Sequence, residues 1–164
     1  MKYITLIVLF FFLISCNQKK SEINNVARNK ELQKRIKILE TQLSNTYTPG
    51  FGEMMSSIQA HHSKLWFAGK NKNWQLANFE VKELNEIIED IEMYQKDREE
   101  TAQIKMIVPA ISALKKSIKK QDFNDFKKDF SQLTNDCNKC HQLTDFGYNK
   151  VKIPNSSPFT NQEF

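Results

Sequence analysis

The chain has 164 residues, a net charge of +5 at neutral pH, and only four glycines and four prolines. This length suffices for one domain with a buried core plus an appendage, and the scarcity of glycine and proline favours an all-α protein over a turn-rich β fold. The lysines are interleaved with Glu and Asp, so the mild positive charge does not indicate a nucleic-acid partner.

Residues 1–15 have the features of a bacterial secretion signal. Lys2 is followed by an apolar run over residues 4–13, which is too short to span a membrane. The residues Leu-Ile-Ser then precede Cys16, and this group resembles a lipobox. The resemblance implies that Cys16 is acylated and anchors the protein through more than one lipid chain. The alternative is an ordinary signal peptide with an incidental cysteine.

Residues 16–48 are expected to form a tether and an N-terminal helix. No acidic run follows Cys16, which by resemblance to lipoprotein sorting rules implies the periplasmic face of the outer membrane. Residues 17–30 are polar and typical of a loose tether. Residues 29–46 look helical, with the spacing of a coiled-coil seam. We expect a spacer helix that packs on the domain, with a dimerising stalk as the alternative. The seam residues are Leu32, Ile36, Leu39 and Leu43.

Four amphipathic segments follow within residues 49–164. Their apolar residues recur at steps of three and four, which predicts helices over about 51–68, 73–95, 101–120 and from residue 123 onward. Pro109 implies a kink in the third helix or a true start near Val108. Asp122 is a good N-cap for the fourth helix. Short links between four such helices predict an antiparallel four-helix bundle.

The C-terminal tail, residues 142–164, is expected to be irregular. It contains Pro154 and Pro158, so it cannot be helical throughout. Either the tail wraps the end of the bundle that holds the functional motif, with Phe159 or Phe164 covering it, or the tail is disordered.

The stretch with a defined chemistry is Cys137-Asn138-Lys139-Cys140-His141. It reads C-x-x-C-H, the attachment pattern for a c-type haem. Two thiols at this spacing add to the two haem vinyl groups, and the adjacent imidazole becomes an axial ligand of the iron. Both cysteines continue the apolar stripe of the fourth helix. We therefore expect one covalent haem c, directed at the core of the bundle.

Two other chemistries are open to a C-x-x-C pair. A zinc site needs four ligands, and only His61 and His62 could complete it. A redox dithiol usually belongs to a βαβ pattern, which this sequence lacks. One cysteine for lipid and two for haem leave none for a disulfide, so the cysteine count agrees with haem attachment after export.

These features resemble the class II cytochromes c, which are four-helix bundles with C-x-x-C-H near the end of the last helix. The resemblance covers about residues 50–145. It implies thioether bonds from Cys137 and Cys140 and a proximal ligand at His141. The family includes five-coordinate members and members with a methionine ligand from the first helix. The chain departs from the family pattern in its additional N-terminal helix and its long tail.

The distal ligand can be sought from the geometry of the expected bundle. The end of the last helix should lie beside the start of the first, where Met55 is on the inward face and Met54 is one position off it. His62 is also inward, two turns further along, and is the alternative; an open position is the third possibility. His61 is expected to project outward, either solvated or near a haem propionate. A Met/His pair suits electron transfer, whereas an open site suits the binding of small gases.

The sequence thus predicts a membrane-anchored monohaem electron carrier with a redox partner protein. No nucleophile or catalytic triad is visible, so an enzyme is not expected. Two alternatives remain: a five-coordinate haem protein that binds or senses NO or CO, and a non-haem structural lipoprotein.

Overall fold

The computed structural model of this chain describes residues 25–43 and 49–164. The predicted signal segment 1–15, the predicted lipidation site Cys16 and the first part of the expected tether lie outside the described residues. The chain divides into two units, Met1–Tyr47 and Thr48–Phe164.

In the first unit, residues 25–43 form one helix. The four seam side chains are all exposed, from 47% at Leu32 to 67% at Leu43. Arg35 pairs with Glu31 one turn earlier, at 3.1 Å. Throughout the described ranges, no helix combines the length and the apolar character that a membrane crossing requires.

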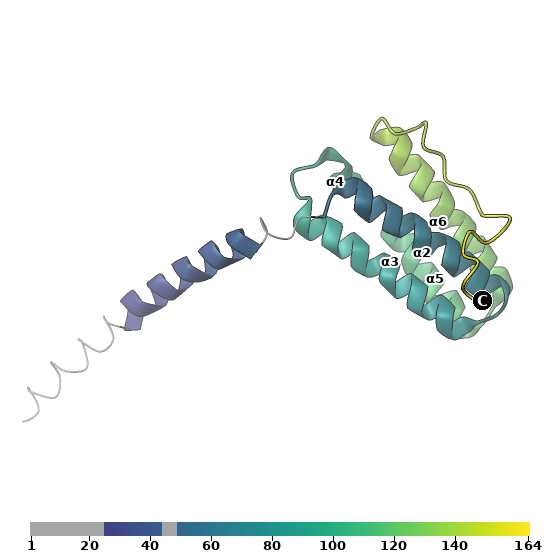
Figure 1. The fold of residues 1–164 in the computed structure, drawn as a ribbon, viewed down its shortest axis with the longest axis horizontal. Helices are drawn as coiled ribbons and strands as arrows, with labels where there is room; N and C mark the ends of the chain where they lie inside the picture. The colour runs from purple at the N-terminus through teal and green to yellow at the C-terminus, as the bar shows by residue number, and fades with distance from the viewer. Residues whose placement is uncertain (1–24, 44–48) are drawn as a thin grey trace, which may run out of the picture. The chain divides into compact units, whose positions relative to one another are not determined.

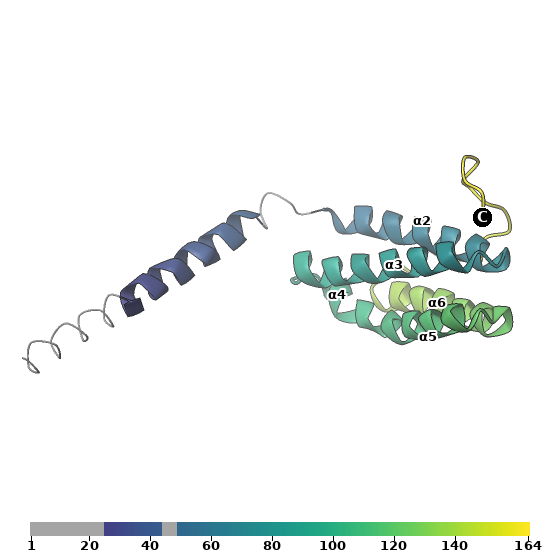
Figure 2. The same cartoon turned by 90° about the horizontal axis from the view of Figure 1, so that it is seen from below.

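The regular secondary structure among the described residues of the second unit is all helical, which confirms the all-α prediction (Figures 1 and 2). The elements are α2 (Phe51–Lys70), α3 (Trp74–Tyr94), α4 (Glu99–Ile104), the 3₁₀ turn η1 (Lys105–Ile107), α5 (Val108–Lys120) and α6 (Phe123–Leu143).

The ends of these helices follow local chemistry in the sequence. The Asp122 carboxylate accepts hydrogen bonds from the backbone N–H groups of Asn124 and Asp125, at 2.9 and 3.0 Å, so its predicted role as N-cap is confirmed. The expected third helix is interrupted by η1, and Pro109 is the second residue of α5. Proline is tolerated there because the first N–H groups of a helix have no intrahelical partner.

The helices pack in sequence-adjacent pairs. Helix α2 packs along α3, α5 packs along α6, and α3 joins the two pairs through α5; Figure 2 shows this arrangement from the side. The apolar stripe of α6 is buried and includes both cysteines of the motif, as predicted. Its buried members are Phe126, Phe130, Leu133, Cys137 and Cys140.

Helices α2 and α6 are in close contact at Gly69, far from the motif. A Cβ atom at Gly69 would lie 2.2 Å from the Phe126 ring, so the backbone of α2 lies directly against that side chain. One turn earlier on α2, Trp66 packs on Phe130 with ring centroids 5.0 Å apart. In these two contacts the residue number decreases on α2 while it increases on α6, so the two helices run in opposite directions.

The tail continues past the motif and along α2. The Phe159 ring lies under the Lys64 ammonium, 5.0 Å from ring centroid to Nζ, and Phe164 packs on Phe67 with centroids 5.5 Å apart. Both contacts are on the second half of α2. The expectation that Phe159 or Phe164 covers the motif is therefore wrong, because the tail is long enough to run on to the other end of this helix.

Candidate functional site

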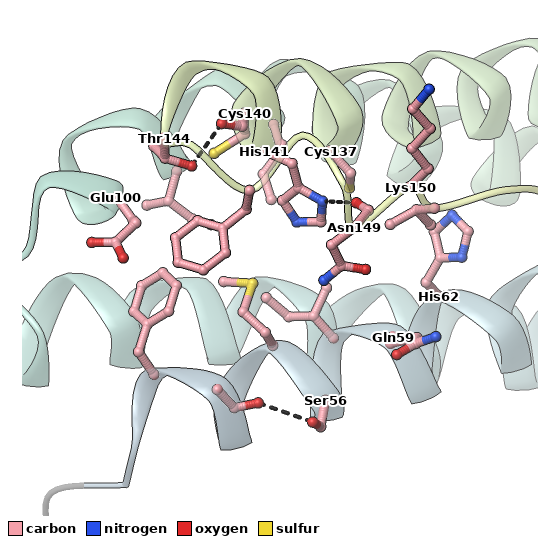
Figure 3. A pocket seen from close by; sticks show the side chains of 18 of the residues that line it. Ser56, Gln59, His62, Glu100, Cys137, Cys140, His141, Thr144, Asn149 and Lys150 are labelled. Carbon is pink, nitrogen blue, oxygen red and sulfur yellow. Dashed lines mark hydrogen bonds between the residues drawn. The ribbon is translucent and has the colours of Figure 1, made fainter.

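A cavity of about 380 Å³ lies between the first half of α2 and the last turns of α6. Cys137, Cys140 and His141 line it from α6, and Met55 and His62 line it from α2. Figure 3 shows the three motif side chains on one side of this cavity and His62 on the other. The structure therefore brings all the candidate haem residues of the sequence into one site.

The remaining walls are mainly apolar, and Figure 3 shows the charged residues Glu100 and Lys150 at opposite ends of the cavity. Arg98 and Glu100 form an ion pair at 2.5 Å, and the Arg98 guanidinium lies 4.9 Å from the centroid of the Phe51 ring. Lys150, from the tail, adds a second cation. An apolar pocket with a few polar groups is typical of a cofactor site. The apolar wall consists of Phe51, Ile58, Ile104, Ile107, Phe146 and Val151.

The two cysteines are buried and carry free thiols. Burial raises the pKa of the Cys137 thiol to about 12, with smaller contributions from Cys140 and Asp136. Burial also raises the pKa of Cys140, and the Glu100 carboxylate adds to the effect. A redox-active C-x-x-C pair has a lowered thiol pKa instead. The environment of these thiols is thus the opposite of that of a redox dithiol.

His141 is oriented by the tail. Its Nδ1 lies 2.6 Å from the backbone carbonyl oxygen of Asn149, a bond that Figure 3 marks with a dashed line. A carbonyl only accepts hydrogen bonds, so Nδ1 carries the proton. The lone pair of the neutral ring is then on Nε2. A histidine that ligates a metal commonly has its other nitrogen held in this way.

The two adjacent methionines have different environments. Met54 is a core residue, 5% exposed, whereas Met55 is partly buried and lines the cavity. Met55 is therefore the methionine placed to reach a ligand in this cavity. Met54, expected one position off the inward face, packs in the core instead.

His62 is held against α6 on the side of the cavity away from α4. Its Nε2 lies 2.9 Å from the Thr134 hydroxyl, and that hydroxyl donates its hydrogen to the carbonyl of Phe130. Nε2 must therefore be the donor, which leaves the lone pair on Nδ1. Burial lowers the pKa of His62 to about 4, so the ring is neutral at physiological pH.

His61 does not project into solvent as expected. Its Nδ1 lies 2.7 Å from a carboxylate oxygen of Glu80 on α3, and the Glu80 side chain is 1% exposed. The other Glu80 oxygen is buried without a hydrogen-bond partner. The expectation was wrong because the position of His61 on its helix gives no information about a carboxylate on the neighbouring helix.

Several contacts at the site were missed by sequence reasoning. Asn138 and Asn149 act through contacts between α6 and the tail, and Arg98, in the α3–α4 link, contacts Glu100 of α4 and Phe51 of α2. No motif or periodicity marks such residues. In the described parts of the chain, no three His, Cys, Asp or Glu side chains gather in an arrangement that could hold a metal ion directly.

Comparison with protein-family models, curated proteins and solved structures finds no match to this chain. The resemblance to class II cytochromes c therefore depends on the motif, the helices and the site geometry alone.

Proposed function

We propose that this protein is a membrane-anchored monohaem c-type cytochrome that transfers electrons, with the antiparallel four-helix arrangement of class II cytochromes. The main support is the meeting of Cys137, Cys140 and His141 on one largely apolar cavity, opposite Met55 of α2. When bound, the haem supplies an iron that takes up and releases one electron.

The residues present fit such a group. Cys137 and Cys140 offer two free thiols at the required spacing, and His141 offers Nε2 as the proximal ligand. Met55 is the proposed distal ligand, and His62, through Nδ1, is the alternative. With haem bound, the apolar walls would limit the access of water to the iron, and this lowers the solvent reorganisation that accompanies electron transfer.

The cavity offers cations for the haem propionates, at two separate places. Arg98 and Lys150 are the two cations that line it, and guanidinium groups bind carboxylates well. In this structure Arg98 pairs with Glu100, so a propionate would compete with that carboxylate for the guanidinium group.

The proposed setting is the bacterial cell envelope. A lipid on Cys16 would anchor the protein at the periplasmic face of the outer membrane, where a redox partner protein exchanges electrons with it. The exposed seam of residues 25–43 supports a homodimer as a further proposal, because an apolar helical stripe in water favours a partner helix. No nucleic-acid partner is proposed.

A visible spectrum tests the proposal. The full chain, expressed in cells that attach c-type haem, should give a low-spin spectrum with a sharp α band on reduction. A Cys137→Ala/Cys140→Ala variant should lack covalent haem, while Lys139→Ala keeps it. A high-spin reduced spectrum that shifts with CO would favour the five-coordinate gas-binding alternative. A colourless wild-type protein would contradict both the electron-transfer and the gas-binding proposals.

The distal ligand is tested by three alanine variants. We expect Met55→Ala to lose the low-spin spectrum, because the thioether is removed from the cavity. His62→Ala and Met93→Ala should keep it; Met93 is an exposed methionine elsewhere in the domain, 57% exposed. A low-spin spectrum that survives Met55→Ala but not His62→Ala would assign the ligand to His62.

A further inference from the structure

The first segment of the tail, residues 144–153, is bonded to α6 at the motif; we call it the C-terminal strap. The side-chain amide of Asn138 donates to the carbonyl of Val151 at 2.9 Å, and its oxygen accepts from the Val151 N–H at 2.8 Å. Asn138 thus satisfies both backbone groups of one strap residue. Only an amide side chain offers a donor and an acceptor in this arrangement.

The second link between the strap and α6 involves His141. Its Nδ1 donates to the carbonyl of Asn149 at 2.6 Å, and its own backbone carbonyl accepts from the Phe146 N–H at 2.8 Å. The imidazole is therefore oriented by a carbonyl that belongs to the strap and not to its own helix.

The two links are in register with each other. Asn138 and His141 are three residues apart on α6, so their side chains lie on the same face of the helix. Asn149 and Val151 are two residues apart on the strap, which is not helical. The bonds from Asn138 fix the position of Val151, and this fixes the position of the Asn149 carbonyl two residues earlier.

We propose that Asn138, the first variable residue of the C-x-x-C-H motif, is a positioning residue for His141. It acts through the C-terminal strap, by holding the Asn149 carbonyl on Nδ1 of the imidazole. The consequence for redox behaviour rests on the proposed function. A hydrogen bond from Nδ1 raises the basicity of the other ring nitrogen, and a more basic ligand favours the ferric state and lowers the reduction potential.

The test compares Asn138→Ala with Lys139→Ala in the full chain. Lys139 is the other variable residue of the same motif and is exposed, so it is a matched control. In Asn138→Ala, the Val151 amide should exchange with solvent about tenfold faster, since its acceptor is removed. In the haem-loaded protein, the potential should become more positive by about 59 mV, which corresponds to a tenfold change in the one-electron equilibrium. Lys139→Ala should change neither quantity.

A third measurement does not need haem. Nitrogen chemical shifts of the His141 ring, recorded on protein from cells without haem attachment, report its tautomer. Wild type and Lys139→Ala should hold the proton on Nδ1, and Asn138→Ala should lose this preference. A colourless wild-type protein would overturn the proposed function, while these shifts would still decide the positioning role.

Two results would overturn the role of Asn138. One is an unchanged tautomer in Asn138→Ala. The other is faster amide exchange at Val151 with an unchanged reduction potential, which would mean that Asn138 holds the tail in place but does not position His141.

Discussion

Helices α2 and α6 touch at one end and enclose a cavity at the other. At the first end, Gly69 lies against the Phe126 ring with no room for a Cβ atom. At the second end, Met55 and the motif cysteines line a volume of about 380 Å³. The same two helices therefore form a close-packed region at one end and a cavity at the other. The size and contacts of the side chains between the helices determine whether a region is packed or open.

The closed end is dominated by aromatic contacts. Trp66 and Trp74 of α2 and α3 pack against the phenylalanines of α6, with Phe126 in the centre. Such contacts bury a large apolar area and are densely packed. This packing stabilises the contact between α2 and α6 at the end away from the cavity.

The largest expected difference in stability loss is between alanine substitutions at the two adjacent methionines of the open end. Met54→Ala should destabilise the protein by about 3 kcal/mol, because it creates a cavity in the core. Met55→Ala should cost less than about 1 kcal/mol, because its side chain already borders empty volume. Urea unfolding of the haem-free protein measures both. Equal losses would mean that Met55 is a core residue and that the cavity is not open.

A smaller effect is expected at the closed end. Gly69→Ala should destabilise the protein by about 2 kcal/mol, since the added methyl group would overlap the Phe126 ring. This loss exceeds the gain in helix propensity on replacing glycine. Gly52→Ala is the matched control, because a Cβ there meets nothing within 4 Å; it should be neutral or slightly stabilising. A neutral Gly69→Ala would show that α2 and α6 are not in close contact.

The smallest effect concerns His62, which lies where the closed contact changes to the cavity. Its pKa is lowered from 6.5 to about 4 by burial, so the unfolded chain binds more protons between these values. The contribution of neutral, buried His62 to the free energy of unfolding is therefore fully present above pH 6.5 and is lost as the pH decreases towards 4. The loss between pH 7 and pH 5.5 should be about 1 kcal/mol.

Urea unfolding at the two pH values, compared between wild type and His62→Gln, isolates this contribution. The variant changes no other histidine, and glutamine keeps a donor for Thr134. A loss of the same size in the variant would assign the pH dependence to other groups.

The stripe of α6 shows what periodicity alone can predict. Apolar residues at steps of three and four placed Phe126, Phe130 and both motif cysteines on one buried face, and all are buried. Asp122 was identified as an N-cap because the interaction is confined to a few adjacent residues. Both predictions depend on local geometry, which the sequence specifies directly.

Positions at the border of a stripe were less predictable. Met54 and Met55 are about 100° apart on the helix, so both are near the edge of the inward face. Which of them enters the core depends on the neighbouring helices. His61 was misplaced for the same reason, since its partner Glu80 is on α3.

The sequence by itself determined the all-helical fold, the start of α6 and the residues of the C-x-x-C-H motif, because these follow from short-range spacing and capping. Only the tertiary structure decided that Met54 packs in the core beside the cavity, that His61 pairs with Glu80, and that the tail orients His141. These contacts join residues far apart in the chain, and their energies depend on distances that only packing sets.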